Sequence, residues 1–173
     1  MTSVSDFTYR NATPADAPLM ARIGAETFTE TFGHLYTPEN LNFFLKNHSV
    51  ENWTAELTDP RFTIRLAEQG GEAVAFAKVG PPGLPFEVTG PTAELRQFYV
   101  LKPWHGTGVA QALMTWVMDE ARARGAEQVF LSVFVDNHRA QRFYARYGFE
   151  QVGTYAFMVG DHADEDLIMR APL

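Results

Sequence analysis

The sequence predicts an α/β domain in which a β-sheet carries helices on its faces. Strand-like apolar runs are interleaved with longer runs whose apolar residues recur at helical spacing. The chain has 173 residues, 46% of them hydrophobic, which is enough to bury one core. No repeat, linker or low-complexity tract divides it, so we expect a single domain over residues 1–173.

The N-terminal third is predicted to hold one strand and three helices. Residues 7–10 favour a strand. Thr13-Pro14-Ala15-Asp16 then supplies an N-cap, a proline at the first helical position and an acid in the first turn, and residues 19–28 continue at helical spacing. Thr37-Pro38-Glu39-Asn40 repeats this start signal for a second helix, and residues 49–57 indicate a short third one.

A hairpin and a long loop follow. Residues 62–67 and 72–79 are strand-like and are separated by Gln69-Gly70-Gly71, which is typical of a hairpin turn. The prolines within residues 81–85 prevent the strand from continuing. Residues 81–92 are therefore predicted to form a loop, and long loops in compact domains are often functional.

The C-terminal half alternates strands and helices, and Gly148 marks the end of its second helix. The predicted elements are a strand at 94–101, a helix at 107–124, a strand at 128–135, a helix at 137–147 and strands at 151–158 and 166–170.

The stretch from His105 to Ala110 lies where a strand gives way to a helix. The first N–H groups of a helix have no intrahelical partner, and the helix dipole makes this end partially positive, so an anion fits there. Gly106 and Gly108 allow positive φ and close approach of a phosphate to the main chain. Two glycines also suit a tight turn that binds nothing.

One type of phosphate-binding loop is excluded at this position and a second is disfavoured. A Walker loop needs a lysine directly after its last glycine, and Gly108 is followed by Val109, Ala110 and Gln111. A dinucleotide-binding Rossmann fingerprint needs a small residue at the position of Gln111 and an acid at the end of the next strand, and residues 128–133 contain no acid.

The composition excludes several classes of function. The formal net charge of −7 argues against a nucleic-acid surface and suits a small cationic partner, although such a charge also serves solubility alone. Without cysteine, the chain has no disulfide, no thiolate metal site and no acyl-cysteine intermediate. The five histidines lack metal-ligand spacing, so no metal is predicted.

The sequence also predicts where in the cell the protein is found. It shows no leader-like start and no apolar run of membrane-spanning length, which predicts a soluble cytoplasmic protein. The local group of acids near the C-terminus is interpreted as compatible with a solvated turn; these are Asp161, Asp164, Glu165 and Asp166.

A second motif covers Asn137 to Phe149, and with the glycine turn it resembles the GNAT superfamily of acyl-CoA N-acyltransferases. The family pattern Gln/Arg-x-x-Gly-x-Gly/Ala is met by Gly108 and Ala110, while His105 stands where the family has Gln or Arg. The pattern Asn-x-x-Ala-x-x-Phe-Tyr-x-x-x-Gly-Phe is met throughout. Outside residues 94–149, the chain is most similar to bacterial spermidine/spermine N-acetyltransferases, in segments 27–32, 37–40, 157–161 and 166–169.

The resemblance implies a GNAT-type domain with a mixed central sheet of about six to seven strands and helices on both faces. It implies acetyl-CoA as co-substrate, direct transfer to a small primary amine without a covalent acyl-enzyme, and a polyamine as one such acceptor. It leaves a homodimer open.

The resemblance also assigns the CoA site, with the pantetheine arm pairing with strand main chain as an added strand and the Val100 N–H polarising the thioester carbonyl. The assigned residues are Phe98, Tyr99, Val100, His105, Gly106, Thr107, Gly108, Val109, Ala110, Asn137 and Arg139. Asn137 also suits a helix N-cap. Lys102 and Arg142 are further phosphate neighbours, or simply solvated cations.

Two residues match catalytic positions of the family. Glu94 is expected to act as the general base, and its alternative is an exposed acid at a strand end. Tyr144 is expected to protonate the departing thiolate, and its alternative is core packing on an apolar helix face. The expected acceptor-binding residues are Glu26, Glu30, Tyr36 and Tyr155, with the loop at 80–92.

The sequence therefore predicts an N-acetyltransferase that moves acetyl from acetyl-CoA to a primary amine. One alternative within the class is acetylation of a protein lysine or N-terminus. The alternative from another class is a non-catalytic acyl-CoA sensor, which would keep the glycine turn but need neither Glu94 nor Tyr144.

Overall fold

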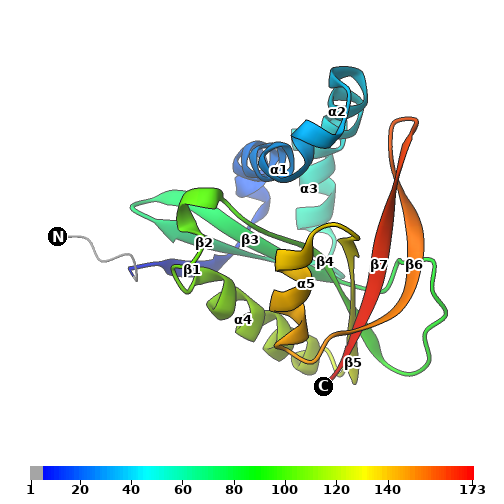
Figure 1. The fold of residues 1–173 in the computed structure, drawn as a ribbon. Helices are drawn as coiled ribbons and strands as arrows, with labels where there is room; N and C mark the ends of the chain where they lie inside the picture. The colour runs from blue at the N-terminus through cyan, green and yellow to red at the C-terminus, as the bar shows by residue number, and fades with distance from the viewer. Residues whose placement is uncertain (1–5) are drawn as a thin grey trace.

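The computed structural model describes residues 6–173, apart from the side chain of Asn47, as a seven-stranded sheet with helices on both faces (Figure 1). The elements are β1 (Thr8–Asn11), α1 (Ala17–Phe32), α2 (Pro38–Leu45), α3 (Val50–Thr58), β2 (Thr63–Gln69), β3 (Glu72–Gly80), β4 (Thr92–Val100), α4 (Val109–Ala123), β5 (Gln128–Phe134), α5 (His138–Ala145), β6 (Glu150–Val159) and β7 (His162–Pro172).

The sheet is mixed, as predicted. Its strand order is β1-β2-β3-β4-β5-β7-β6. Every neighbouring pair is antiparallel except β4 and β5, which are parallel. Among residues 6–173, no helix has the length and apolar character needed to cross a bilayer.

The two parallel strands separate soon after they meet. Thr92–Glu94 pair with Gln128–Phe130, and there the pairing ends. Both strands continue, β4 to Val100 and β5 to Phe134, so the sheet opens between them. Unpaired main chain therefore borders a gap in the middle of the sheet.

A β-bulge in β4 changes which side chains face this gap. Lys78 of β3 pairs with Gln97 and Val79 pairs with Leu95, so Arg96 is an extra residue on β4. The extra residue reverses the alternation of side chains. Leu95 and Phe98 consequently belong to one core cluster, whereas the neighbouring Tyr99 packs against the cluster on the other face.

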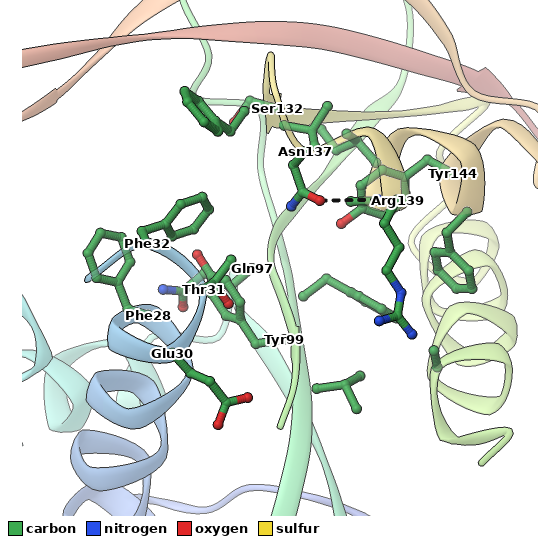
Figure 2. Close-up of a pocket in the computed structure, with 18 of the residues that line it drawn as sticks. Phe28, Glu30, Thr31, Phe32, Gln97, Tyr99, Ser132, Asn137, Arg139 and Tyr144 are labelled. Atoms are coloured by element: carbon green, nitrogen blue, oxygen red, sulfur yellow. Dashed lines mark hydrogen bonds between the residues drawn. The ribbon is translucent and has the colours of Figure 1, made fainter. Parts of the chain in front are cut away.

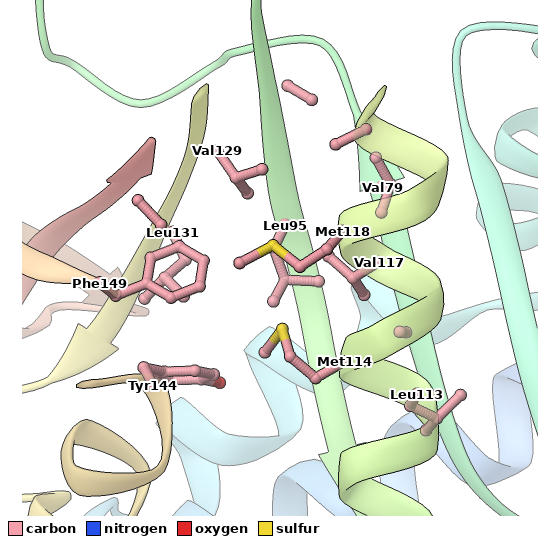
Figure 3. Close-up of a cluster of buried hydrophobic side chains, with 14 of the residues drawn as sticks. Val79, Leu95, Leu113, Met114, Val117, Met118, Val129, Leu131, Tyr144 and Phe149 are labelled. Carbon is pink, nitrogen blue, oxygen red and sulfur yellow. The ribbon is translucent and has the colours of Figure 1, made fainter. Parts of the chain in front are cut away.

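The core has two parts, one on each face of the sheet. On one face, α4 places Leu113, Met114 and Val117 against the central strands, and Tyr144 joins them from α5 (Figure 3). On the other face, α1 and α3 bury a second cluster that includes Trp53. This arrangement confirms the predicted helices on both faces.

Several boundaries differ from the prediction, and long-range pairing is the main cause. The last strand begins at His162 rather than at residue 166, because residues 162–165 pair with β6 although their composition resembles a turn. The first α-helix extends to Phe32, and α4 begins only at Val109, because Gly108 adopts a left-handed conformation with φ of 93°.

Candidate active site

One cavity of about 650 Å³ occupies the gap between β4 and β5. We call the part next to α4 and α5 the glycine side; it is lined by His105, Gly106, Gly108, Ala110, Gln111, Asn137 and Arg139. We call the part next to α1 and α2 the acidic side; it is lined by Phe28, Phe32, Tyr36, Phe44, Ser132, Phe134, Phe157, Asp164 and Asp166. Figure 2 shows side chains from α1, β4 and α5 around the cavity.

The glycine turn presents main chain to the cavity. Gly106 and Gly108 have φ of 76° and 93°, which other residues rarely adopt. A Cβ added at either position would meet no atom within 4 Å, so the backbone conformation, not crowding, requires glycine here. Gly108 caps the 15-residue helix α4, whose positive end is therefore directed at the cavity wall.

His105 connects the end of β4 to α5. Its Nε2 lies 2.8 Å from the Val100 carbonyl oxygen, and its Nδ1 lies 2.8 Å from Nη1 of Arg139. A guanidinium only donates and a carbonyl only accepts, so the ring is neutral and carries its proton on Nε2. His105 thus holds Arg139 at the cavity. It also donates a hydrogen bond to the Val100 carbonyl, so this carbonyl is not free to pair with an added strand.

The start of α5 is capped by Asn137. Its Oδ1 accepts a hydrogen bond of 3.3 Å from the Ala140 N–H, as an N-cap does (Figure 2). The residue also lines the cavity. The cap uses the side-chain oxygen, which leaves the amide NH₂ as the group that can donate to a ligand.

Tyr144 lies in the cavity wall and in the core at once. Its side chain is 8% exposed, and its ring meets the ring of Phe98 edge-on at 6.2 Å. Burial raises the pKa of the Tyr144 hydroxyl, so the group stays protonated at neutral pH. Core packing, one of the two interpretations made from the sequence, is therefore confirmed, and the same side chain also lines the cavity, where its role as an acid stays a prediction.

Glu94 lies elsewhere than expected. Its Oε1 accepts from the N–H groups of Gly83, at 2.8 Å, and Leu84, at 3.1 Å, and its Oε2 lies 3.1 Å from Nε of Arg96. It does not line the cavity. Glu94 as a whole residue is only 5% exposed. Its carboxylate fixes the loop after β3 to the start of β4. The expectation of a general base at this position therefore has no geometric support.

Four other expected residues also stand outside the cavity lining. Glu26 is exposed on α1, and the buried side chain of Val109 packs in the core. The Thr107 hydroxyl donates to the Trp104 carbonyl at 2.5 Å, which stabilises the turn. The Tyr155 hydroxyl lies 3.2 Å from Ser132 Oγ.

The remaining expected residues do line the cavity, namely Glu30, Tyr36, Phe98, Tyr99, Val100, His105, Gly106, Gly108, Ala110, Asn137, Arg139 and Tyr144. Glu30 accepts a hydrogen bond from the Lys102 main-chain N–H. Lys102 also lines the cavity, whereas Arg142 does not.

The acidic side contains two aspartates that the sequence interpretation placed in a solvated turn. Asp164 and Asp166 are 7% and 8% exposed, and both line the cavity from β7. Asp164 accepts from the Tyr36 hydroxyl and lies 3.0 Å from Nε2 of His162. Burial, reinforced by the neighbouring charge of Asp164, raises the pKa of Asp166 to about 7.

Aromatic rings form the walls around these aspartates. Phe28 stacks on Phe44 at 4.2 Å, and Phe44 meets Phe157 at 5.6 Å. Phe32 contacts Phe134 edge-on at 6.1 Å. Within residues 6–173, no group of three or more His, Asp or Glu side chains is arranged to hold a metal ion.

Comparison with known proteins places this geometry in a family. The chain is 37% identical over 155 residues to an uncharacterized N-acetyltransferase of Mycobacterium tuberculosis. The matched region covers 89% of this chain and 96% of that relative. The crystal structure of PaiA N-acetyltransferase from Thermoplasma acidophilum in complex with coenzyme A has the same fold, with a TM-score of 0.79 at 17% identity, over 97% of this chain and 99% of that one.

A ribosomal-protein-alanine N-acetyltransferase from Brucella melitensis is 26% identical, with a TM-score of 0.67 over 96% of this chain and 99% of that one. The family model "Acetyltransferase (GNAT) family" matches residues 21–149, which include the glycine turn, the gap between β4 and β5, and Tyr144. The chain therefore belongs to the GNAT family of acetyltransferases and is an N-acetyltransferase.

Proposed function

We propose that this enzyme transfers acetyl from acetyl-CoA directly to a primary amine bound on the acidic side. The observation that carries the proposal is that one continuous cavity joins the positive end of helix α4 to a pair of buried carboxylates. A phosphate-bearing donor and a cationic acceptor can thus meet in the gap between β4 and β5. The structural likeness to PaiA N-acetyltransferase, which was solved with coenzyme A, supports the choice of donor.

The glycine side fits the donor chemically. The α4 N-terminus and Arg139 offer positive charge for a pyrophosphate, and the NH₂ of Asn137 is a donor for an amide of the pantetheine arm. The Leu101 N–H donates a hydrogen bond to the Val74 carbonyl of β3. Since successive N–H groups of a strand point to opposite sides, the Val100 N–H faces the gap, where it can polarise a thioester carbonyl.

Tyr144 is the group that protonates the departing sulfur. Thioester cleavage produces a thiolate, and a neutral hydroxyl beside it can supply a proton. The raised pKa keeps Tyr144 in this neutral form over the working pH range. Its ring is fixed between Phe98 and Phe149, so the hydroxyl is held in place.

A panel assay tests the function. Thiol release from acetyl-CoA would be followed with spermidine, spermine, 2-phenylethylamine, butylamine and a lysine peptide, and products would be identified by mass spectrometry. Turnover of at least one amine to its acetamide is expected. Binding of CoA by calorimetry without turnover of any amine would indicate an acyl-CoA sensor, and absence of CoA binding would refute both functions.

A further inference from the structure

The acidic side is built on one face of the three C-terminal strands. Residues that pair directly across an antiparallel ladder share a face of the sheet. Asp166 of β7 pairs with Phe134 of β5 and with Tyr155 of β6, and Asp164 pairs with Phe157. Two carboxylates and several rings therefore point to the same side, toward α1 and α2.

The two aspartates differ in their partners. Asp164 is held by Tyr36 and His162, so its orientation is fixed. Asp166 has the Ser132 hydroxyl nearby, which lowers its pKa slightly against the larger effect of burial, and no lysine, arginine or histidine of residues 6–173 forms an ion pair with it. Asp166 is thus a buried carboxylate, directed at a cavity, whose charge lacks a cation.

Two histidines lie on this side of the cavity, but neither forms an ion pair with Asp166: His162 contacts Asp164, and His34 lines the cavity between α1 and α2. The groups whose charge is coupled to that of Asp166 include Asp164 on its own strand, Tyr155 on β6, Tyr99 on β4 and Tyr36 between α1 and α2. These four groups are acids or phenols, so none of them supplies a positive charge to Asp166. An unpaired buried carboxylate is costly, and a bound cation would offset that cost.

We propose that Asp166 binds the ammonium group of the acceptor and receives its proton before attack. The proposal rests on the proposed function and replaces Glu94, whose carboxylate is bound to Gly83, Leu84 and Arg96, as the candidate base. Asp164, with Tyr36, is a positioning residue that keeps negative charge beside Asp166.

The proton balance follows directly. The Asp166 carboxylate takes one proton from R–NH₃⁺, and the free amine nitrogen attacks the thioester carbonyl carbon. The C–N bond forms, the C–S bond breaks, and Tyr144 protonates the sulfur. The nitrogen loses its second proton as the amide forms, which restores Tyr144 directly or through solvent. The sum is R–NH₃⁺ plus acetyl-CoA giving the acetamide, CoA thiol and one H⁺, which leaves from Asp166.

The test compares variants of one strand with whichever panel amine the wild type acetylates fastest. Asp166→Asn is expected to lower kcat/KM for the amine by at least ~10²-fold, which is the usual contribution of a general base. Its Kd for CoA, measured by calorimetry, should stay within about twofold of the wild type, because the glycine side is untouched. Glu165→Gln, an exposed neighbour on the opposite face, is the matched control and should keep full activity.

The pH profile separates a base from a merely structural aspartate. Wild-type kcat/KM should fall as pH drops through about 7, where Asp166 becomes protonated. A primary amine titrates at roughly 10.4 and stays an ammonium ion throughout this range. Asp164→Asn should move the midpoint to lower pH, because the Asp164 charge helps raise the Asp166 pKa.

The outcomes distinguish this inference from the function on which it depends. If the wild type acetylates an amine and Asp166→Asn retains the rate and the acidic limb of the profile, the role of Asp166 is refuted while the function stands. If the wild type acetylates no amine, both fail.

Discussion

Replacing Asp166 by asparagine should make the protein more stable at neutral and alkaline pH, whatever the enzyme acetylates. The reason is the raised pKa of this buried carboxyl, about 7 in the folded protein against 3.8 when exposed. Below pH 3.8 the carboxyl is neutral in both states and costs nothing. As pH rises toward 7, the unfolded chain releases this proton and the folded one keeps it, so folding loses stability.

The magnitude follows from this shift. One pKa unit corresponds to about 1.4 kcal/mol, so the penalty reaches about 4 kcal/mol once pH exceeds the folded-state pKa of Asp166. Asparagine cannot ionise, but it still buries a polar amide in place of the acid. We therefore expect Asp166→Asn to gain about 2–4 kcal/mol at pH 8 and little at pH 4.

Urea unfolding at pH 4, 6 and 8, followed by tryptophan fluorescence and circular dichroism, measures the effect. The difference between Asp166→Asn and wild type should grow with pH at constant m value, whereas Glu165→Gln should track the wild type because its side chain is exposed. A stability difference that stays flat between pH 4 and pH 8 would show that Asp166 is ionised in the folded protein with an ordinary pKa, and the reasoning would be refuted.

Four further substitutions test the rest of the site. Tyr144→Phe should lower kcat at least ~10²-fold and leave CoA affinity nearly unchanged, and a kcat within twofold of wild type would remove the acid role. Glu94→Gln should cost about 1–3 kcal/mol in urea unfolding, because it weakens the bonds to the loop after β3, without changing the pH midpoint of kcat/KM. Gly108→Ala should cost about 1–3 kcal/mol through backbone strain at φ of 93°, and an unchanged urea midpoint would contradict this. His105→Ala should weaken CoA binding about two- to fivefold in calorimetry by releasing Arg139, and equal affinities would show that the contact does not matter.

Local signals in the sequence predicted most of the fold. Proline and acid at helix starts, and the Gln69-Gly70-Gly71 turn, act through neighbouring residues, so each could be interpreted without tertiary contacts. The glycine turn was predicted for the same reason, since positive φ at Gly106 and Gly108 is a property of the backbone itself. The bulge at Arg96 had no such signal, because it is defined only by pairing with β3.

The chemistry of the acidic side could not be predicted in this way. Asp164 and Asp166 stand among hydrophilic neighbours, and only the pairing of β7 with both β5 and β6 buries them. Alternation is the one signal that was available, since 164 and 166 fall on the same face as Ile168 once residues 162–172 form a strand. The contacts of Glu94 were not predictable for the complementary reason, because an acid at a strand end fits the family pattern whether or not the main chain of a loop binds its carboxylate.

The separation of β4 and β5 explains why Asp166, whose burial lowers the stability of the fold, faces a cavity. A continuous sheet would pair the β5 main chain with β4 and close the space in front of Phe134 and Asp166. Because the strands separate, the carboxylate is buried in a cavity and not in packed core, so a ligand can supply the missing cation. The stability lost at Asp166 without ligand should then be recovered when an ammonium ion binds. An acceptor amine should accordingly raise the melting temperature of the wild type at pH 8, and should not raise that of Asp166→Asn.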